Sequence, residues 1–193
     1  MIASRVAQST QARGERAVIE TMIVPTDGSA HADKAVELAA DLAGKYGARL
    51  IIVHALLHGE TPVGLLTLCK RLNAPAELLV KIETESAQMV TTMGSAYAEV
   101  PVILPMSKAL LEEIGELICA RARDAATARG AASIEVNVVD GAAAEIILAA
   151  AKHEKADMIV MGSRGLGRLE GFLLGAVSQR VNHLAECTCV TVK

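Results

Sequence analysis

Short apolar runs alternate with longer segments of helical spacing along most of the chain. The runs are nearly continuous and are bounded by polar or small residues, a pattern typical of strands that are covered on both faces. Five strands are therefore predicted, at residues 21–24, 49–54, 133–139, 157–161 and 187–192.

Helices are predicted between the strands, because Leu, Ile and Ala recur there every three or four residues. Four of them cover residues 30–46, 107–129, 142–153 and 174–185. This alternation predicts an α/β fold with a five-stranded parallel sheet, doubly wound and joined by right-handed crossovers. Ligands of such sheets bind beyond the carboxyl ends of the strands. The predicted binding rim consists of Pro25, Thr26, Asp27, His54, Ala55, Val139, Asp140, Gly141 and residues 161–165.

One region exceeds what this fold requires. Between the second strand and the helix at 107–129 the chain carries about fifty residues where a short link would do. Helices are predicted at 61–72 and 75–92, and an extended connector at 94–105. This insertion, 56–106, leaves the binding rim and could cover a site there. The alternatives are a structural helical pair and a dimer-packing element.

Composition narrows the possible partners. Hydrophobic residues make up 52% of the 193 residues, but aromatic residues only 2%. The net charge is −3 and the isoelectric point is about 6.0. Such a chain offers neither a basic field for nucleic acid nor aromatic rings that stack on bases. Nucleic acid is therefore not expected as a partner.

The N-terminal stretch 1–18 is polar and contains Arg5, Arg13 and Arg16, without the apolar middle of a signal peptide. It is predicted to be a mobile tail, and 19–193 a single domain that includes the insertion. No apolar run is long enough to span a bilayer. We therefore expect a cytoplasmic protein without a membrane partner, in which the four cysteines are reduced thiols.

The residues that follow the fourth strand carry the strongest functional signal. They comprise Gly162, Gly165, Gly167 and Gly171, with Arg164 and Arg168 between them, and then Gly175-Ala176-Val177-Ser178, which opens the last helix. A strand, a glycine-rich loop and a helix start together form an anion site, because backbone amides point at the ligand and the helix dipole favours negative charge. A phosphate-bearing ligand is predicted, and a flexible surface loop is the alternative. The spacing fits neither a P-loop nor a dinucleotide fingerprint.

These residues resemble the nucleotide motif of the universal stress protein family, which is Gly, two residues, Gly, nine residues, Gly, then Ser or Thr. Gly162, Gly165 and Gly175 have this spacing. The segments 23–29 and 50–55 and the terminal strand also look like the family's. The resemblance covers about 19–55 and 107–193, and it leaves 1–18 and the insertion unexplained. It implies a Rossmann-like fold that binds an adenine nucleotide.

The resemblance also implies a role for individual positions. Thr26 and Asp27 would border the base and ribose, the backbone of Ala55 would contact the adenine edge, and Met161 would lie beside the base. The glycine loop would lie against ribose and phosphate, and the last helix would hold the outer phosphates. The complete set of expected nucleotide-binding residues is Pro25, Thr26, Asp27, Ala55, Met161, Gly162, Arg164, Gly165, Gly175, Ala176, Val177 and Ser178.

Two positions depart from the family pattern. Ala176 stands where the motif has a hydroxyl residue, which removes a phosphate hydrogen bond worth about 0.5–1.5 kcal/mol. Ser178, in the same turn, could supply a hydroxyl instead. Gly141-Ala142-Ala143 replaces the family's frequent Gly-x-Pro. These departures predict weakened nucleotide binding rather than none.

Three functions remain open at this point. The first is an ATP-binding regulatory protein of the stress response, with no or very slow hydrolysis. Its ATP could carry Mg²⁺ on Asp27 or Asp140. The second is an interaction module with an empty site, and the third is an adenylyl-transferring enzyme. No catalytic set and no metal cluster is recognised, and His54 is expected to bind a backbone carbonyl. The resemblance further implies a homodimer through the C-terminal strand.

Overall fold

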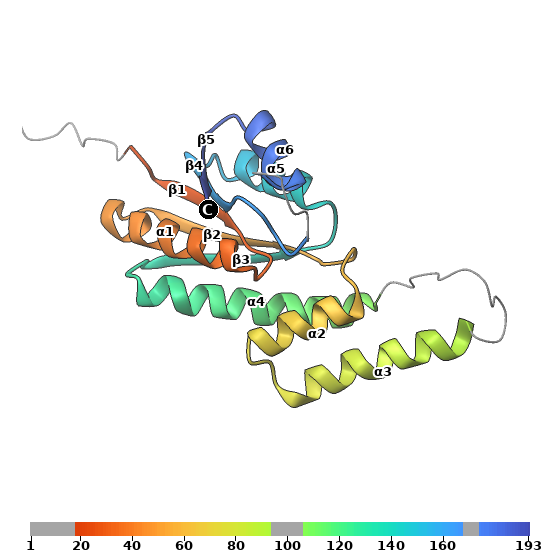
Figure 1. Ribbon diagram of the computed structural model, residues 1–193. Helices are drawn as coiled ribbons and strands as arrows, with labels where there is room; N and C mark the ends of the chain where they lie inside the picture. Colours follow the sequence, from red (N-terminus) through yellow and green to blue (C-terminus); the bar gives the residue numbers. More distant parts are fainter. Residues whose placement is uncertain (1–17, 94–105, 168–173) are drawn as a thin grey trace, which may run out of the picture.

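The computed structural model describes residues 18–93, 106–167 and 174–193. Within these residues five parallel strands form one sheet in the order β3-β2-β1-β4-β5 (Figure 1). The strands are β1 (Thr21–Pro25), β2 (Arg49–Ala55), β3 (Ser133–Val139), β4 (Met158–Gly162) and β5 (Thr188–Val192). Each lies within one residue of its predicted bounds, so the predicted five-stranded parallel sheet is confirmed.

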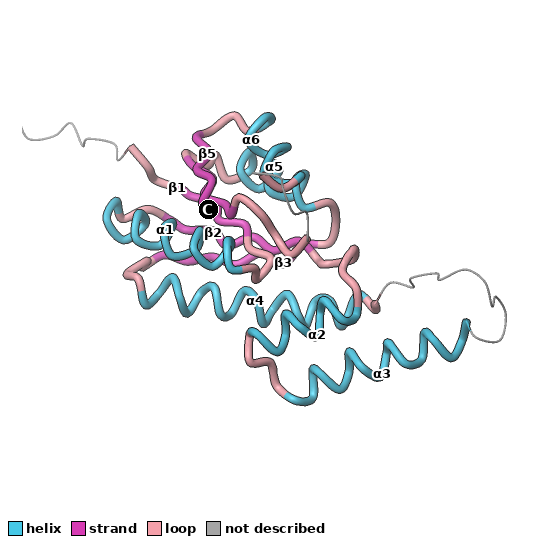
Figure 2. Tube along the Cα trace, in the orientation of Figure 1, coloured by secondary structure: helices cyan, strands magenta, loops and turns pink. Residues whose placement is uncertain are grey.

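Helices cover both faces of the sheet (Figure 2). The helices α1 and α4 pack on one face, where alanines of α1 meet Leu50 and Ile52 of β2. The helices α5 and α6 pack on the other face, against Ile23, Ile51 and Ile159. The six helices are α1 (Ala30–Tyr46), α2 (Pro62–Arg71), α3 (Ala76–Met93), α4 (Lys108–Ala128), α5 (Ala143–His153) and α6 (Ala176–Leu184).

The start of α1 is fixed by its cap. The Ser29 side chain accepts a hydrogen bond from the backbone N–H of Ala32, at 3.3 Å, which satisfies one of the amides that a helix start leaves unpaired. At the other end Gly47 takes the left-handed conformation, with φ of 66°. Because Ser29 caps the helix, the carboxylate of Asp27 is available for another task.

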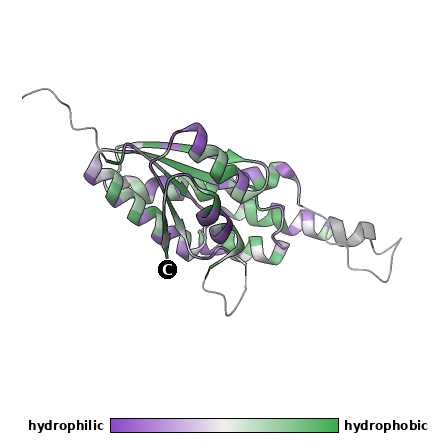
Figure 3. Cartoon of the chain, turned by 90° about the horizontal axis from the view of Figure 1, so that it is seen from above, coloured by the Kyte–Doolittle hydropathy of each residue, from purple (hydrophilic) through white to green (hydrophobic). Residues whose placement is uncertain are grey.

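The insertion forms a helical pair beside α4, away from the sheet (Figures 1 and 3). The helices α2 and α3 and the outward side of α4 share a core of their own, separate from the two cores on the sheet. It contains Leu65, Leu68 and Leu72 of α2, Leu78 and Ile82 of α3, and Leu111, Ile114 and Ile118 of α4. The helices predicted at 61–72 and 75–92 are confirmed as α2 and α3. The expected connector 94–105 lies outside the described residues. Residues 1–17 of the expected tail 1–18 also lie outside them.

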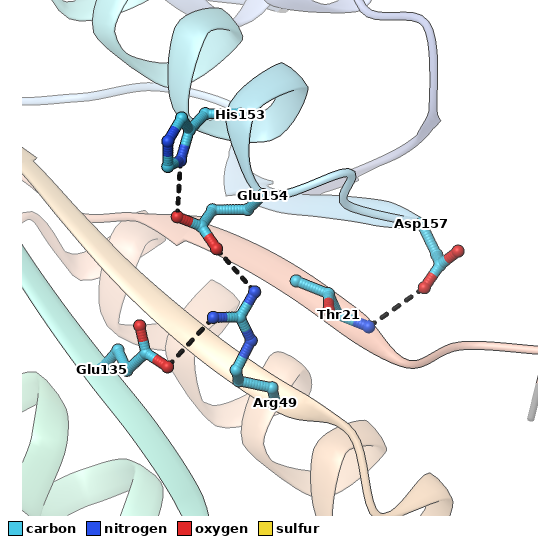
Figure 4. Close-up of polar contacts among 6 residues, drawn as sticks. All are labelled: Thr21, Arg49, Glu135, His153, Glu154 and Asp157. Atoms are coloured by element: carbon cyan, nitrogen blue, oxygen red, sulfur yellow. Dashed lines mark hydrogen bonds and ion pairs between the residues drawn. The ribbon is translucent and has the colours of Figure 1, made fainter.

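A polar network joins the starts of the strands, at the edge opposite the binding rim (Figure 4). The Arg49 guanidinium on β2 binds Glu135 on β3 at 3.0 Å and Glu154 after α5 at 2.5 Å. Hydrogen bonds from His153 and from Arg49 lower the pKa of Glu154. The Asp157 carboxylate accepts the backbone N–H of Thr21 at 3.0 Å. The Arg49 contacts thus join the starts of β2 and β3 to the end of α5, and the Asp157 contact joins the start of β1 to the residue before β4.

No helix in the described part of the chain is long and apolar enough to cross a membrane.

Candidate functional site

A cavity of about 450 Å³ opens at the carboxyl ends of the strands. It is enclosed by the ends of β1, β2 and β4, by the glycine loop, and by the first turns of α5 and α6. All of the expected nucleotide-binding residues line it: Pro25, Thr26, Asp27, Ala55, Met161, Gly162, Arg164, Gly165, Gly175, Ala176, Val177 and Ser178. The structure thus brings this set together around one hollow.

The Asp27 carboxylate holds the glycine loop in place. Its Oδ1 atom accepts the backbone N–H of Ser29 and its Oδ2 atom accepts the backbone N–H of Leu166, both at 2.9 Å. A Cβ atom at Gly165 would lie 2.3 Å from Oδ2. Any side chain at position 165 would therefore displace the Asp27 carboxylate from the Leu166 amide.

The other end of the loop is tied to the neighbouring backbone. A Cβ at Gly162 would lie 2.8 Å from the carbonyl carbon of His31, so this glycine lets β4 end against the first turn of α1. The Ser163 N–H donates to the carbonyl of Val192 at 2.7 Å, and the Gly175 N–H donates to the carbonyl of Ser163 at 2.8 Å. The two ends of the glycine-rich segment, Ser163 and Gly175, are consequently in direct contact.

The first turn of α6 faces the cavity without a side-chain cap. Gly175 is its N-cap residue, and no side chain binds the amides of the first turn among the described residues. Such amides carry partial positive charge and bind anions. The Ser178 hydroxyl is engaged elsewhere, because it donates toward the carbonyls of Ser163 and Gly175, at 3.0 and 2.9 Å. In this structure the donors that α6 offers an anion are thus backbone amides.

His54 is fully buried beneath the rim. Its Nδ1 atom lies 2.8 Å from the carbonyl oxygen of Thr26, which confirms the expected bond to a backbone carbonyl. The ring therefore carries its proton on Nδ1 and donates it. Its Nε2 atom has no hydrogen-bond partner among the residues that the structure describes, and the ring lies against Gly115, where a Cβ would be 2.8 Å from the ring carbon Cδ2. Burial lowers the pKa of His54, which keeps the ring neutral.

Asp140 lies at the rim but outside the cavity lining. Its carboxylate is bound by His58 at 2.6 Å and by Lys108 at 3.2 Å, and these two partners lower its pKa. Of the two carboxylates expected near Mg²⁺, only Asp27 lines the cavity. Among the described residues no group of three or more His, Cys, Asp or Glu side chains could hold a metal ion by itself.

Comparison with known proteins identifies the family. The model of the Universal stress protein family matches residues 19–193. The chain belongs to this family. A universal stress protein of Thermus aquaticus is 33% identical over 177 residues, which cover 91% of this chain and 100% of that protein. Universal stress protein YxiE of Bacillus subtilis is 27% identical over 172 residues, which cover 89% and 97% of the two chains.

Solved structures agree with the family and its fold. A universal stress protein solved in complex with cAMP is 26% identical, with a TM-score of 0.53 over 90% of this chain and 96% of that one. A universal stress protein of Archaeoglobus fulgidus solved in complex with dAMP is 16% identical, with a TM-score of 0.55 over 91% and 99% of the two chains. This second likeness shows the shared fold.

Sequence reasoning missed one wall of the cavity. The first residues of the insertion, Leu56, Leu57, Gly59 and Glu60, line it together with the expected set. The family motif does not extend to them. The signal that could have identified these residues was their position, because they directly follow the end of β2 at the binding rim. The insertion thus contributes these four residues to the cavity lining, whereas α2 and α3 pack on α4.

Proposed function

We propose that this universal stress protein binds an adenine nucleotide in the cavity at the carboxyl edge of its sheet and acts as a regulator through nucleotide occupancy. The observation that carries the proposal is the uncapped first turn of α6 beside the glycine loop, at a cavity of about 450 Å³. The cAMP complex of a relative that is 26% identical supports an adenine nucleotide as the ligand class.

The cavity offers a plausible orientation for such a ligand. The phosphate would lie at the backbone amides of Ala176, Val177 and Ser178, where the helix dipole favours negative charge. The exposed Arg164 side chain is near enough to this end to line the same cavity. The base and ribose would then lie toward Met161, Ala55 and Asp27, as the family motif implies.

ATP with Mg²⁺ is the nucleotide that the family motif favours, with Asp27 as the nearest carboxylate. Asp27, Glu60 and Arg164 are the titratable side chains among the described residues of the lining. The Asp27 carboxylate is already bound to two backbone amides, so it is not available to take a proton from an attacking water. We therefore expect no hydrolysis or very slow hydrolysis.

The decisive experiment is a calorimetric titration of nucleotide-stripped protein with Mg²⁺-ATP, AMP and cAMP, beside a Gly165→Val variant. Binding in the micromolar range that the variant loses would support the proposal. Thermal unfolding of both proteins checks that the variant is folded at the titration temperature. Absence of heat with every nucleotide would reject the proposal. It would favour the interaction module instead, a second candidate supported by Ala176 and by the engaged hydroxyl of Ser178.

A homodimer through β5 is a further part of the proposal. β5 is an edge strand: it pairs with β4 on one side and has no strand partner on the other among the described residues. Unpaired strand edges favour association with a second copy. Light scattering at micromolar concentration should give twice the chain mass of 20.1 kDa, and a monomer would exclude the dimer. The cytoplasmic location and the single-domain division expected above remain predictions.

A further inference from the structure

The insertion contributes one acidic side chain to the cavity, Glu60. It directly precedes α2, is half-buried, and lies on the lining together with Asp27 and Arg164. Unlike Asp27, its carboxylate makes no hydrogen bond or ion pair with any of the residues that the structure describes. The carboxylate of a cavity-lining residue that has no partner among the described residues can accept hydrogen bonds from a ligand and repels negative charge.

The position of this carboxylate is fixed by the start of α2. The backbone N–H of Glu60 donates to the carbonyl of Leu57 at 3.1 Å, which closes a tight turn. The Glu60 Oε2 atom lies over Gly64, where a Cβ would be only 2.8 Å away. Thr61 caps α2 through the N–H of Gly64 at 3.0 Å. A negative charge beside the first turn of a helix is stabilised by the helix dipole, which favours this position of the Glu60 side chain.

The sheet topology places Glu60 opposite the anion end of the cavity. The segment 56–60 follows β2, which lies on one side of β1, whereas α6 precedes β5, beyond β4 on the other side of β1. Figure 1 shows α6 and α2 on opposite sides of the sheet. The cavity is therefore lined on one side by the amides of α6 with Arg164, and on the other side of β1 by the segment that contains Glu60.

We propose that Glu60 is a specificity-determining residue of this cavity: it selects nucleotides whose ribose carries free hydroxyls and rejects those with a second phosphate on the ribose. This inference rests on the proposed nucleotide binding and deepens it. A phosphate bound at α6 directs the nucleoside toward the wall formed by 56–60. A ribose hydroxyl near that wall donates a hydrogen bond to Glu60, whereas a phosphate on the same ribose meets a like charge.

The test compares AMP with adenosine 3′,5′-bisphosphate, which differs by one phosphate on the ribose. The full-length protein should bind AMP more tightly, and the Glu60→Gln variant should reduce that preference by a factor of about five or more. Even in the dielectric of water, the repulsion between two like charges about 4 Å apart lowers an affinity by roughly this factor. AMP affinity should change by less than about twofold, because glutamine still accepts a hydrogen bond from a hydroxyl. The preference of the unmodified protein should also fall as salt is added.

A matched control removes the same charge elsewhere on the insertion. Glu83 is exposed on α3 and does not line the cavity, so Glu83→Gln should leave the preference for AMP unchanged. If the unmodified protein binds AMP and Glu60→Gln leaves the ratio of the two affinities as it was, the inference is wrong while nucleotide binding stands. If Glu83→Gln lowers the ratio equally, net charge rather than Glu60 sets the preference, and the inference is again wrong. If AMP does not bind at all, the proposed function fails and the inference falls with it.

Discussion

The contact between Asp27 and the glycine loop predicts a large effect for the smallest possible substitution, Gly165→Ala. The added methyl group would lie 2.3 Å from the Asp27 Oδ2 atom, so the carboxylate must leave its position. The hydrogen bond from the Leu166 N–H to Oδ2, at 2.9 Å, is then lost. Hydrogen bonds to charged groups contribute about 1.5–3 kcal/mol. Replacing glycine by alanine returns about 0.4–1 kcal/mol by reducing the entropy of the unfolded chain.

The expected net loss of unfolding free energy is therefore about 1–2 kcal/mol, measured by urea unfolding followed by circular dichroism. For a domain of this size the melting temperature should fall by about 3–6 °C. Gly167→Ala is the matched control, because a Cβ there meets no atom within 4 Å and the residue does not have a positive φ. This control should be as stable as the unmodified protein or slightly more stable.

A double-mutant cycle isolates the contact itself. In an Asp27→Ala background no carboxylate remains for the new methyl group to displace, so Gly165→Ala should cost almost nothing there. The coupling free energy between the two positions should be at least about 1 kcal/mol, as for other residues in direct contact. Additive effects of Asp27→Ala and Gly165→Ala would refute the argument, as would equal stabilities of Gly165→Ala and Gly167→Ala.

Two further predictions concern buried titratable groups. Because burial holds the folded-state pKa of His54 below its ordinary value of 6.5, the stability that its neutral ring contributes is present above about pH 6.5 and is lost as the pH falls through and below that value. Urea unfolding from pH 8 to pH 5 should show this loss, and a His54→Gln variant that keeps the full dependence would contradict it. Burial also raises the pKa of the Cys69 thiol to about 11 and that of Cys119 to about 12, so in the folded protein Ellman's reagent should modify the half-buried Cys187 and Cys189 first. Rapid modification of all four thiols without denaturant would show that the core around α4 opens readily.

Local patterns predicted the elements well, since periodicity and caps are encoded by neighbouring residues. The bounds of α1 follow from Ser29, which caps its first turn, and from Gly47 after its last turn. Ser29 and Asp27 are both of residue types that suit an N-cap, so local sequence does not decide which of them caps α1. The structure resolves this choice through a long-range contact, since the Asp27 carboxylate binds the backbone N–H of Leu166, which is 139 positions away in the sequence. No local pattern reports such a contact.

The sequence could predict the expected binding residues where they belong to the family's nucleotide motif. The motif specifies glycines, but not which hydroxyl protons remain free. Ser178 is in the expected turn, yet its hydroxyl is bound to backbone carbonyls of the same loop. Glu60 could not be recognised for a different reason. It belongs to the insertion, and its place on the cavity depends on the turn before α2 and on the space over Gly64.

The insertion and the glycine loop are joined through Leu166. The backbone N–H of this residue binds Asp27 at 2.9 Å, at the end of β1. Its side chain packs against the apolar cluster that α2 and α3 form with α4. Gly28, next to Asp27, meets the same cluster, because a Cβ there would lie 3.2 Å from side-chain atoms of Leu68 and Ile118. The glycine loop is thus held by a carboxylate on one side and by the core of the insertion on the other. We therefore expect substitutions inside that helical pair to act on the cavity through the position of Leu166, although among the described residues of the insertion only Leu56, Leu57, Gly59 and Glu60 line it.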